Sequence, residues 1–190
     1  MLHKLSTLSI FKPTDTTTEQ RIKITLLTLF VAFCLNCNAQ KTNKVFLTTA
    51  FQIDVPKNTN GLGGRVACGA NINQQLLLGV GFGVTKMQDV DKTITPVFVH
   101  FGLGDFSKKV FPYFIAEPGY GLYEKSEVTA TETIITKGGF NFYGGAGMGV
   151  STGKKSKATF TIGYSLYNFN TEGIDSSLRG VSFKIAFLGI

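Results

Sequence analysis

The stretch that decides the fold is LLLGVGFGVT, Leu76–Thr85. Beginning at Leu76, every second residue is large and apolar, and most of the residues between them are glycine. Successive side chains of a β-strand point to opposite faces, whereas a helix repeats its apolar positions every three or four residues. The stretch therefore predicts a strand with one bulky apolar face and one nearly bare face.

Seven more segments alternate in the same way, and each is about as long as the 9 to 11 residues that a tilted strand needs to cross a bilayer. Their second face is rich in Gly, Ser, Thr, Asn and Tyr, which would coat a soluble sandwich poorly but suits a narrow lumen. The pattern predicts an all-β fold, an eight-stranded antiparallel up-and-down transmembrane β-barrel. The other segments are Lys44–Val55, Gly63–Asn73, Thr95–Gly104, Val110–Tyr123, Gly139–Val150, Lys157–Tyr167 and Arg179–Ile190.

The links between these segments alternate between long and short, as they do in outer-membrane barrels. A chain that keeps its N-terminus in the periplasm would place its long links outside the cell. Closing the sheet into a ring would also remove the strand edges that hydrocarbon does not tolerate. The long links are Pro56–Leu62, Lys86–Thr93, Glu124–Lys137 and Asn168–Ser177, and the short ones are Asn73–Gln75, Asp105–Lys109 and Ser151–Ser156.

The N-terminal region contains an export signal. Residues 21–39 hold two positive charges, the apolar run Ile24–Leu35 and then small or polar residues, which is typical of a secretory signal peptide cleaved after Ala39. The apolar run spans only about 18 Å as a helix, less than a bilayer core. Residues 1–20 are interpreted as an extension or a mis-called start, and residues 40–190 as the barrel domain. A retained anchor helix and lipid attachment at Cys34 or Cys37 are the alternatives.

Composition narrows the remaining classes. The chain has 190 residues, 22 Gly, 17 Phe, 6 Tyr, 5 Pro and no Trp, with a formal net charge of +7. Such a content of Gly and Phe argues against a disordered or collagen-like chain. A net positive charge is also typical of proteins that bind nucleic acid. Here the lysines lie in separate turns rather than on one face, and the export signal argues against a nucleic-acid partner.

Residues 40–190 resemble the small eight-stranded outer-membrane barrels of Gram-negative bacteria. The stretch ITPVFVHFGLGDFSKKVFPYFIAEPGYGLYE, Ile94–Glu124, together with the NAQ junction Asn38–Gln40, resembles the outer-membrane β-barrel domain proteins common in Bacteroidetes. The resemblance implies location in the cell outer membrane and contact with outer-membrane lipids.

The last predicted strand is similar to the assembly signal that such barrels present to their insertion machinery. Gly180, Phe183 and Ile185 match its glycine and two hydrophobic positions. Leu178 stands where a polar residue is usual, and Ile190 stands where a terminal Phe is usual. The resemblance implies the barrel assembly machinery as a partner during biogenesis.

Two features invite a chemical interpretation. GGAGMGVSTGKK, Gly144–Lys155, superficially resembles a phosphate loop, but Met148 stands where the first Gly is needed and Lys155 where Ser or Thr is needed. His100 is the one histidine after residue 39, without a serine elbow or a second histidine for a metal. We therefore predict no catalytic, cofactor-binding or metal-binding residue, and no cofactor.

Charged residues at inward positions predict a structural polar network in the lumen. Asp54 and Arg65 lie on either side of one link and are expected to pair near the outer mouth. Glu117, His100 and Lys184 lie near the middle of their strands, and Lys184 is expected to reach Glu117 across the lumen with His100 nearby. The alternative is that water hydrates each charge separately.

The leading function is that of a non-enzymatic integral outer-membrane protein with a structural or surface-interaction role, whose outer loops contact an unknown extracellular ligand or stabilise the membrane. A porin-like role in small-solute transport is the second, although eight strands leave little bore. The others are a lipid-modifying enzyme and a soluble periplasmic lipid-binding barrel with its apolar face inside.

Overall fold

A computed structural model describes residues 44–57, 59–88, 92–128, 133–171 and 174–190. The extension and the signal peptide expected from the sequence lie outside these residues. The described strands are β1 (Lys44–Pro56), β2 (Gly61–Ile72), β3 (Leu76–Met87), β4 (Lys92–Gly104), β5 (Val110–Leu122), β6 (Glu124–Val128), β7 (Thr133–Ser151), β8 (Ser156–Thr171) and β9 (Ile174–Gly189). Within the described residues, no helix is long and apolar enough to span a membrane.

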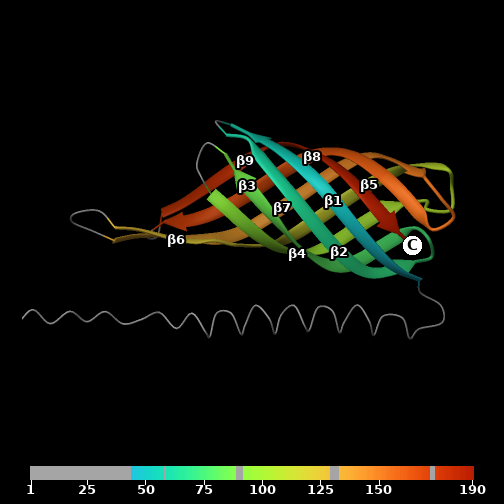
Figure 1. Cartoon of the computed structure of the whole chain (residues 1–190), viewed down its shortest axis with the longest axis horizontal. Coiled ribbons are helices and arrows are strands. Elements are labelled where there is room, and N and C mark those ends of the chain that lie inside the picture. Colours follow the sequence, from blue (N-terminus) through green and yellow to red (C-terminus); the bar gives the residue numbers. More distant parts are fainter. Residues whose placement is uncertain (1–43, 58, 89–91, 129–132, 172–173) are drawn as a thin grey trace, which may run out of the picture. The chain divides into compact units, whose positions relative to one another are not determined.

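The strands form one closed antiparallel ring (Figure 1). The neighbouring strands from β1 through β5 pair in sequence order (β1–β2, β2–β3, β3–β4 and β4–β5), as do β7–β8 and β8–β9. The pairs β1–β9 and β5–β7 complete the ring. The short β6 follows β5 and pairs with β7 beyond the end of β5, so the ring has eight positions. The predicted eight-stranded antiparallel up-and-down barrel is confirmed.

The large apolar side chains point outward, as the alternation predicts. On β3, Phe82 and Val84 are 36% and 48% exposed, while the adjacent Gly81 and Gly83 face the lumen. The ring of Phe98 fills the space beside Gly81, where an added Cβ would lie 2.6 Å from the ring. Glycine is therefore required here by close approach of an aromatic side chain inside a narrow barrel.

Three tight connections and the C-terminus lie at one end of the barrel, which we call the short-turn end (Figure 1). The β2–β3 connection is the tightest: Gln75 N–H donates to Ile72 O at 3.1 Å, and both central residues, Asn73 and Gln74, have positive φ. Such a turn matches the right-handed twist of the two strands that it joins. The opposite end is called the long-loop end.

Two of the predicted long links are largely strand, and this part of the prediction is wrong. The range Glu124–Lys137 contains β6 and the first residues of β7, and the range Asn168–Ser177 contains the end of β8 and the start of β9. The ladder continues because these segments form cross-strand pairs of their own, such as the 3.0 Å hydrogen bond between the hydroxyls of Thr136 and Thr171.

Apolar clusters fill the lumen near both ends. At the short-turn end, the buried cluster consists of Phe46, Leu77, Phe106, Phe111, Tyr113, Ile115, Tyr143 and Leu188. At the long-loop end, it consists of Met87, Ile94, Tyr167 and Phe169, with Tyr123 and Leu178 packed against it. Between them lies a layer of buried polar side chains.

Candidate functional site

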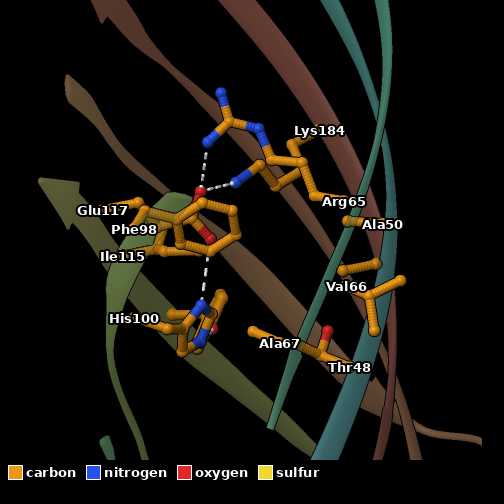
Figure 2. Close-up of a pocket in the computed structure, with 12 residues that line it drawn as sticks. Thr48, Ala50, Arg65, Val66, Ala67, Phe98, His100, Ile115, Glu117 and Lys184 are labelled. Atoms are coloured by element: carbon orange, nitrogen blue, oxygen red, sulfur yellow. Dashed lines mark hydrogen bonds and ion pairs between the residues drawn. The ribbon is translucent and has the colours of Figure 1, made fainter. Parts of the chain in front are cut away.

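Glu117 on β5 is the centre of this polar layer (Figure 2). Its Oε2 accepts from Arg65 Nη1 at 2.8 Å and from Lys184 Nζ at 2.5 Å. Its Oε1 lies 2.9 Å from His100 Nδ1. All four residues are 2% to 4% exposed. One carboxylate thus holds side chains from β2, β4 and β9 across the lumen.

The two-residue period of the strands explains why these polar groups face inward. Arg65 is followed by the outward Val66, and Lys184 is followed by the outward Ile185, which is 48% exposed. Because the apolar neighbours take the outer face, the charged side chains must enter the lumen. There they lie out of water, where a charge is tolerated only when it is paired.

Asp54 forms a second centre on β1. Its Oδ1 accepts from Gln52 Nε2 at 2.7 Å, from Ser165 Oγ at 2.8 Å and from Ser182 Oγ at 2.5 Å. Its Oδ2 accepts from the hydroxyl of Tyr167 at 2.9 Å. Four neutral donors therefore stabilise this carboxylate, which is 1% exposed.

The predicted direct pair between Asp54 and Arg65 is replaced by an indirect link. Arg65 Nη2 donates to the hydroxyl of Tyr167 at 3.1 Å, and the same hydroxyl donates to Asp54. The long Arg65 side chain reaches Glu117, while hydroxyl and amide donors already surround Asp54. Tyr167 thus joins the two carboxylate centres into one network.

Aromatic rings support both cations. Lys184 Nζ lies 3.8 Å from the centroid of the Tyr143 ring. The Arg65 guanidinium carbon lies 5.2 Å from the centroid of Phe98 and 5.8 Å from that of Tyr143. The Tyr143 hydroxyl is in turn 2.7 Å from Thr161 Oγ1. The negative face of a ring favours a nearby cation, so these contacts add to the attraction of Glu117.

The network leaves almost no free space. The cavity beside Glu117 and Lys184 is about 10 Å³, close to the lower limit for a single water molecule. Tyr113, His100 and Glu117 form a chain, since the Tyr113 hydroxyl lies 3.3 Å from His100 Nε2. A nucleophile–base–carboxylate series of this kind needs room for a substrate, and this cavity provides none.

The structure also places the other chemical candidates. Strand β7 runs to Ser151, so most of the glycine-rich stretch Gly144–Lys155 is strand and does not form a phosphate-binding loop before a helix. Among the described residues, no group of three or more His, Cys, Asp or Glu side chains is placed to hold a metal ion.

Sequence reasoning missed the polar partners of Asp54. Ser182 lies directly opposite Asp54 in the β1–β9 ladder, but Ser165 and Tyr167 come from β8, two strands away. The sequence shows only that these Ser, Gln and Tyr residues face the lumen, and it does not show which of them contact Asp54. The register of three strands was needed to bring these particular ones together.

The fold is similar to that of a neisserial surface protein of known structure. The crystal structure of Neisserial surface protein A matches with a TM-score of 0.53 at 12% identity, covering 76% of this chain and 94% of that chain. The N-terminal β-barrel domain of Pseudomonas aeruginosa OprF matches with a TM-score of 0.47 at 13% identity, over 77% of this chain and 98% of that chain. A de novo designed transmembrane β-barrel matches with a TM-score of 0.36 at 17% identity, over 78% and 98%. No protein-family model and no curated protein sequence matches.

Proposed function

We propose that this protein is an integral outer-membrane β-barrel of a Gram-negative bacterium, not an enzyme, with a barrel closed to solutes. The observation that carries the proposal is the apolar band on the outer face of a closed ring. Apolar side chains that are 36% or more exposed occur on every full-length strand, for example Leu47 at 53% and Phe187 at 61%. A continuous apolar surface of this kind is solvated by lipid and not by water.

The filled lumen supports a structural role over transport. Apolar clusters occupy both ends, and the ionic layer between them has two buried carboxylates and two buried basic groups, Arg65 and Lys184, linked to one another. A standing water channel needs a wider bore than eight strands provide. The same filling leaves no room for a lipid ligand, which argues against a soluble lipid-binding barrel.

The proposal extends to topology and biogenesis. A signal peptide over residues 21–39 would deliver the chain to the periplasm, the barrel assembly machinery would insert it, and the long-loop end would face outside. The similarity of the Ile94–Glu124 stretch to Bacteroidetes proteins suggests the source. Intact mass of the purified membrane form tests the cleavage: we expect an N-terminus at Gln40, and a lipid adduct on Cys34 or Cys37 would replace this part of the proposal.

Fractionation and conductance test the main proposal. We expect the protein in the outer-membrane pellet, released by detergent and not by osmotic shock. Purified protein added to a planar bilayer should insert without a steady conductance. Release by osmotic shock would contradict the membrane location, and a steady open-channel current from wild type would contradict the closed barrel.

A further inference from the structure

We propose that the short-turn end binds anionic lipid headgroups through a basic rim, defined as Lys108, Lys109, Lys154 and Lys155. All four side chains are exposed. The inference rests on the proposed function, because it assumes that a bilayer surrounds the barrel. It adds a specific class of partner: phospholipids with a net negative headgroup in the leaflet around this end.

The two turns that carry the rim are held side by side. Val110 pairs with Val150 in the β5–β7 ladder. Just beyond that pair, Ser151 N–H donates to Lys109 O at 2.8 Å, and Ser151 Oγ donates to Lys108 O at 3.0 Å. The β4–β5 and β7–β8 turns therefore form one surface, although their lysines are more than 40 positions apart in the chain.

The backbone of the second turn is also fixed. The N–H groups of Thr152 and Gly153 donate to Ser156 O at 3.0 and 3.2 Å. Ile190 N–H donates to Lys155 O at 2.9 Å, which ties the turn to the strand end of β9. Because these bonds already hold the backbone of the turn, little backbone entropy is lost when its exposed lysines contact a headgroup.

The rim has little negative charge of its own. Asp105 is the one acidic residue in the two turns, and its Oδ2 lies 3.2 Å from Lys108 Nζ. Two contacts lower the pKa of Asp105 below its usual value: the hydrogen bond from Ser107 has the larger effect, and the contact with Lys108 has the smaller one. This single carboxylate therefore stays charged. The buried Lys157 places a further ammonium behind the rim, where it donates to Ser151 Oγ at 2.6 Å. The surface keeps an excess of positive charge.

The rim lies where headgroups are expected. It borders the outward apolar residues at this end of β5 and β7, Val110 and Val150, which are 49% and 43% exposed. On the neighbouring β4, Leu103 is 53% exposed. Lysines just past an apolar band extend their stems along it and place the ammonium at the level of the phosphates. A clustered set at that depth favours anionic over zwitterionic lipid.

The long-loop end offers a matched control. Its exposed basic residues come from three different places: Lys57 directly follows β1, Lys86 is the last residue but one of β3, and Arg179 lies in the first half of β9. Removing three positive charges there changes the net charge of the protein by the same amount without touching the rim. The test variant is Lys109→Gln, Lys154→Gln and Lys155→Gln, and the control variant is Lys57→Gln, Lys86→Gln and Arg179→Gln.

The experiment measures lipid selectivity in vesicles. Each protein is reconstituted into phosphatidylcholine vesicles that contain spin-labelled phosphatidylglycerol or spin-labelled phosphatidylcholine, and the motionally restricted fraction of each label is compared by electron paramagnetic resonance. One lysine near the membrane surface favours an anionic lipid by up to about fivefold. The measured selectivity is an average over all lipids that contact the barrel, most of which do not touch the rim. For wild type we therefore expect phosphatidylglycerol to be preferred over phosphatidylcholine by about threefold. The selectivity should fall towards one in 1 M salt, where the Debye length is about 3 Å.

The outcomes separate this inference from the proposed function. Loss of selectivity in the rim variant, with selectivity retained in the control variant, supports the rim. Equal selectivity of wild type for both labels, or equal loss in both variants, overturns it. Vesicle flotation and the mobility of unboiled protein on a gel are measured on the same samples. Wild-type protein that fails to float with vesicles refutes the membrane proposal and the rim together, whereas floating protein without selectivity refutes the rim alone.

Discussion

Glu117 is the residue on which the ionic layer depends, because its carboxylate is the shared partner of Arg65, Lys184 and His100. Removing one member of a buried pair leaves an unpaired charge, which typically costs about 3 to 5 kcal/mol. Glu117→Gln leaves two buried cations without their carboxylate. Lys184→Met leaves Glu117 with Arg65 still bound, so its cost should be the smaller of the two.

Urea unfolding in detergent micelles measures this coupling. We expect Glu117→Gln to lower the free energy of unfolding more than Lys184→Met, and the double variant to lose clearly less than the sum of the two. The exposed Lys86→Gln serves as the control and should change stability by less than about 0.5 kcal/mol. Strictly additive losses would mean that the Lys184–Glu117 contact contributes no coupling energy.

A second prediction compares two glycines on neighbouring strands: Gly81 on β3 faces the lumen, and Gly64 on β2 faces outward. A Cβ at Gly81 would lie 2.6 Å from the Phe98 ring and 2.6 Å from Val66 O, whereas a Cβ at Gly64 meets no atom within 4 Å. Gly81→Ala should therefore destabilise the barrel by about 1 to 3 kcal/mol through overpacking. Gly64→Ala should be neutral or stabilising by up to about 1 kcal/mol. The same unfolding assay compares them, and equal effects would contradict the assignment of the two faces.

At the scale of the element, β3 shows how one strand serves two environments. Phe82 faces outward at 36% exposure, and its neighbours Gly81 and Gly83 face the lumen. The pleat of the strand separates the two sets of side chains. If the barrel lies in a bilayer as proposed, the effect of a substitution on the outer face depends on contact with lipid. The effect of one on the inner face depends on packing in the lumen.

Phe82→Arg tests the lipid side of this argument. An arginine near the midplane of the bilayer costs roughly 2 to 4 kcal/mol, so the folded fraction after refolding into vesicles should fall. Phe82→Leu keeps the position apolar and should refold like wild type. The folded fraction is read from the fast-migrating band of unboiled protein, and efficient refolding of Phe82→Arg would show that this position does not contact hydrocarbon.

The extended hairpins are a second property at this scale. Strands β7, β8 and β9 have 19, 16 and 16 residues, which is longer than a tilted strand needs to cross a bilayer. The sheet formed by β6, β7, β8 and the start of β9 therefore extends past the ends of β1 and β5 at the long-loop end (Figure 1). Ile174, at the start of β9, is 74% exposed there.

At the scale of the whole molecule, closure is the dominant feature. The β1–β9 and β5–β7 pairs leave the ring without an open edge along its length. Detergent has no unpaired strand at which to begin separating the ladder. Folded protein should therefore run faster than boiled protein on a gel that contains dodecyl sulfate. Identical mobility before and after boiling, in several mild detergents, would contradict a closed barrel.

The fold was largely predictable because its main signal is local. The alternation in Leu76–Thr85 and the seven similar segments depends only on the two-residue period of a strand, and it assigned the apolar side chains to the outer face. The error in Glu124–Lys137 has a local cause as well. Its residues are mostly Glu, Thr, Lys and Ser, so the hydrophobic period does not detect β6 and the start of β7 there.

The sequence by itself determined the class of fold, the two faces of each strand and the inward position of Glu117, His100 and Lys184, because each of these follows from a residue and its immediate neighbours. Only the tertiary structure decided that Arg65 meets Glu117, and that Asp54 is held by Ser165, Ser182 and Tyr167. Contacts across the lumen depend on the stagger with which the ring closes. That stagger is set by all the strand registers together, so no single segment of the sequence contains it.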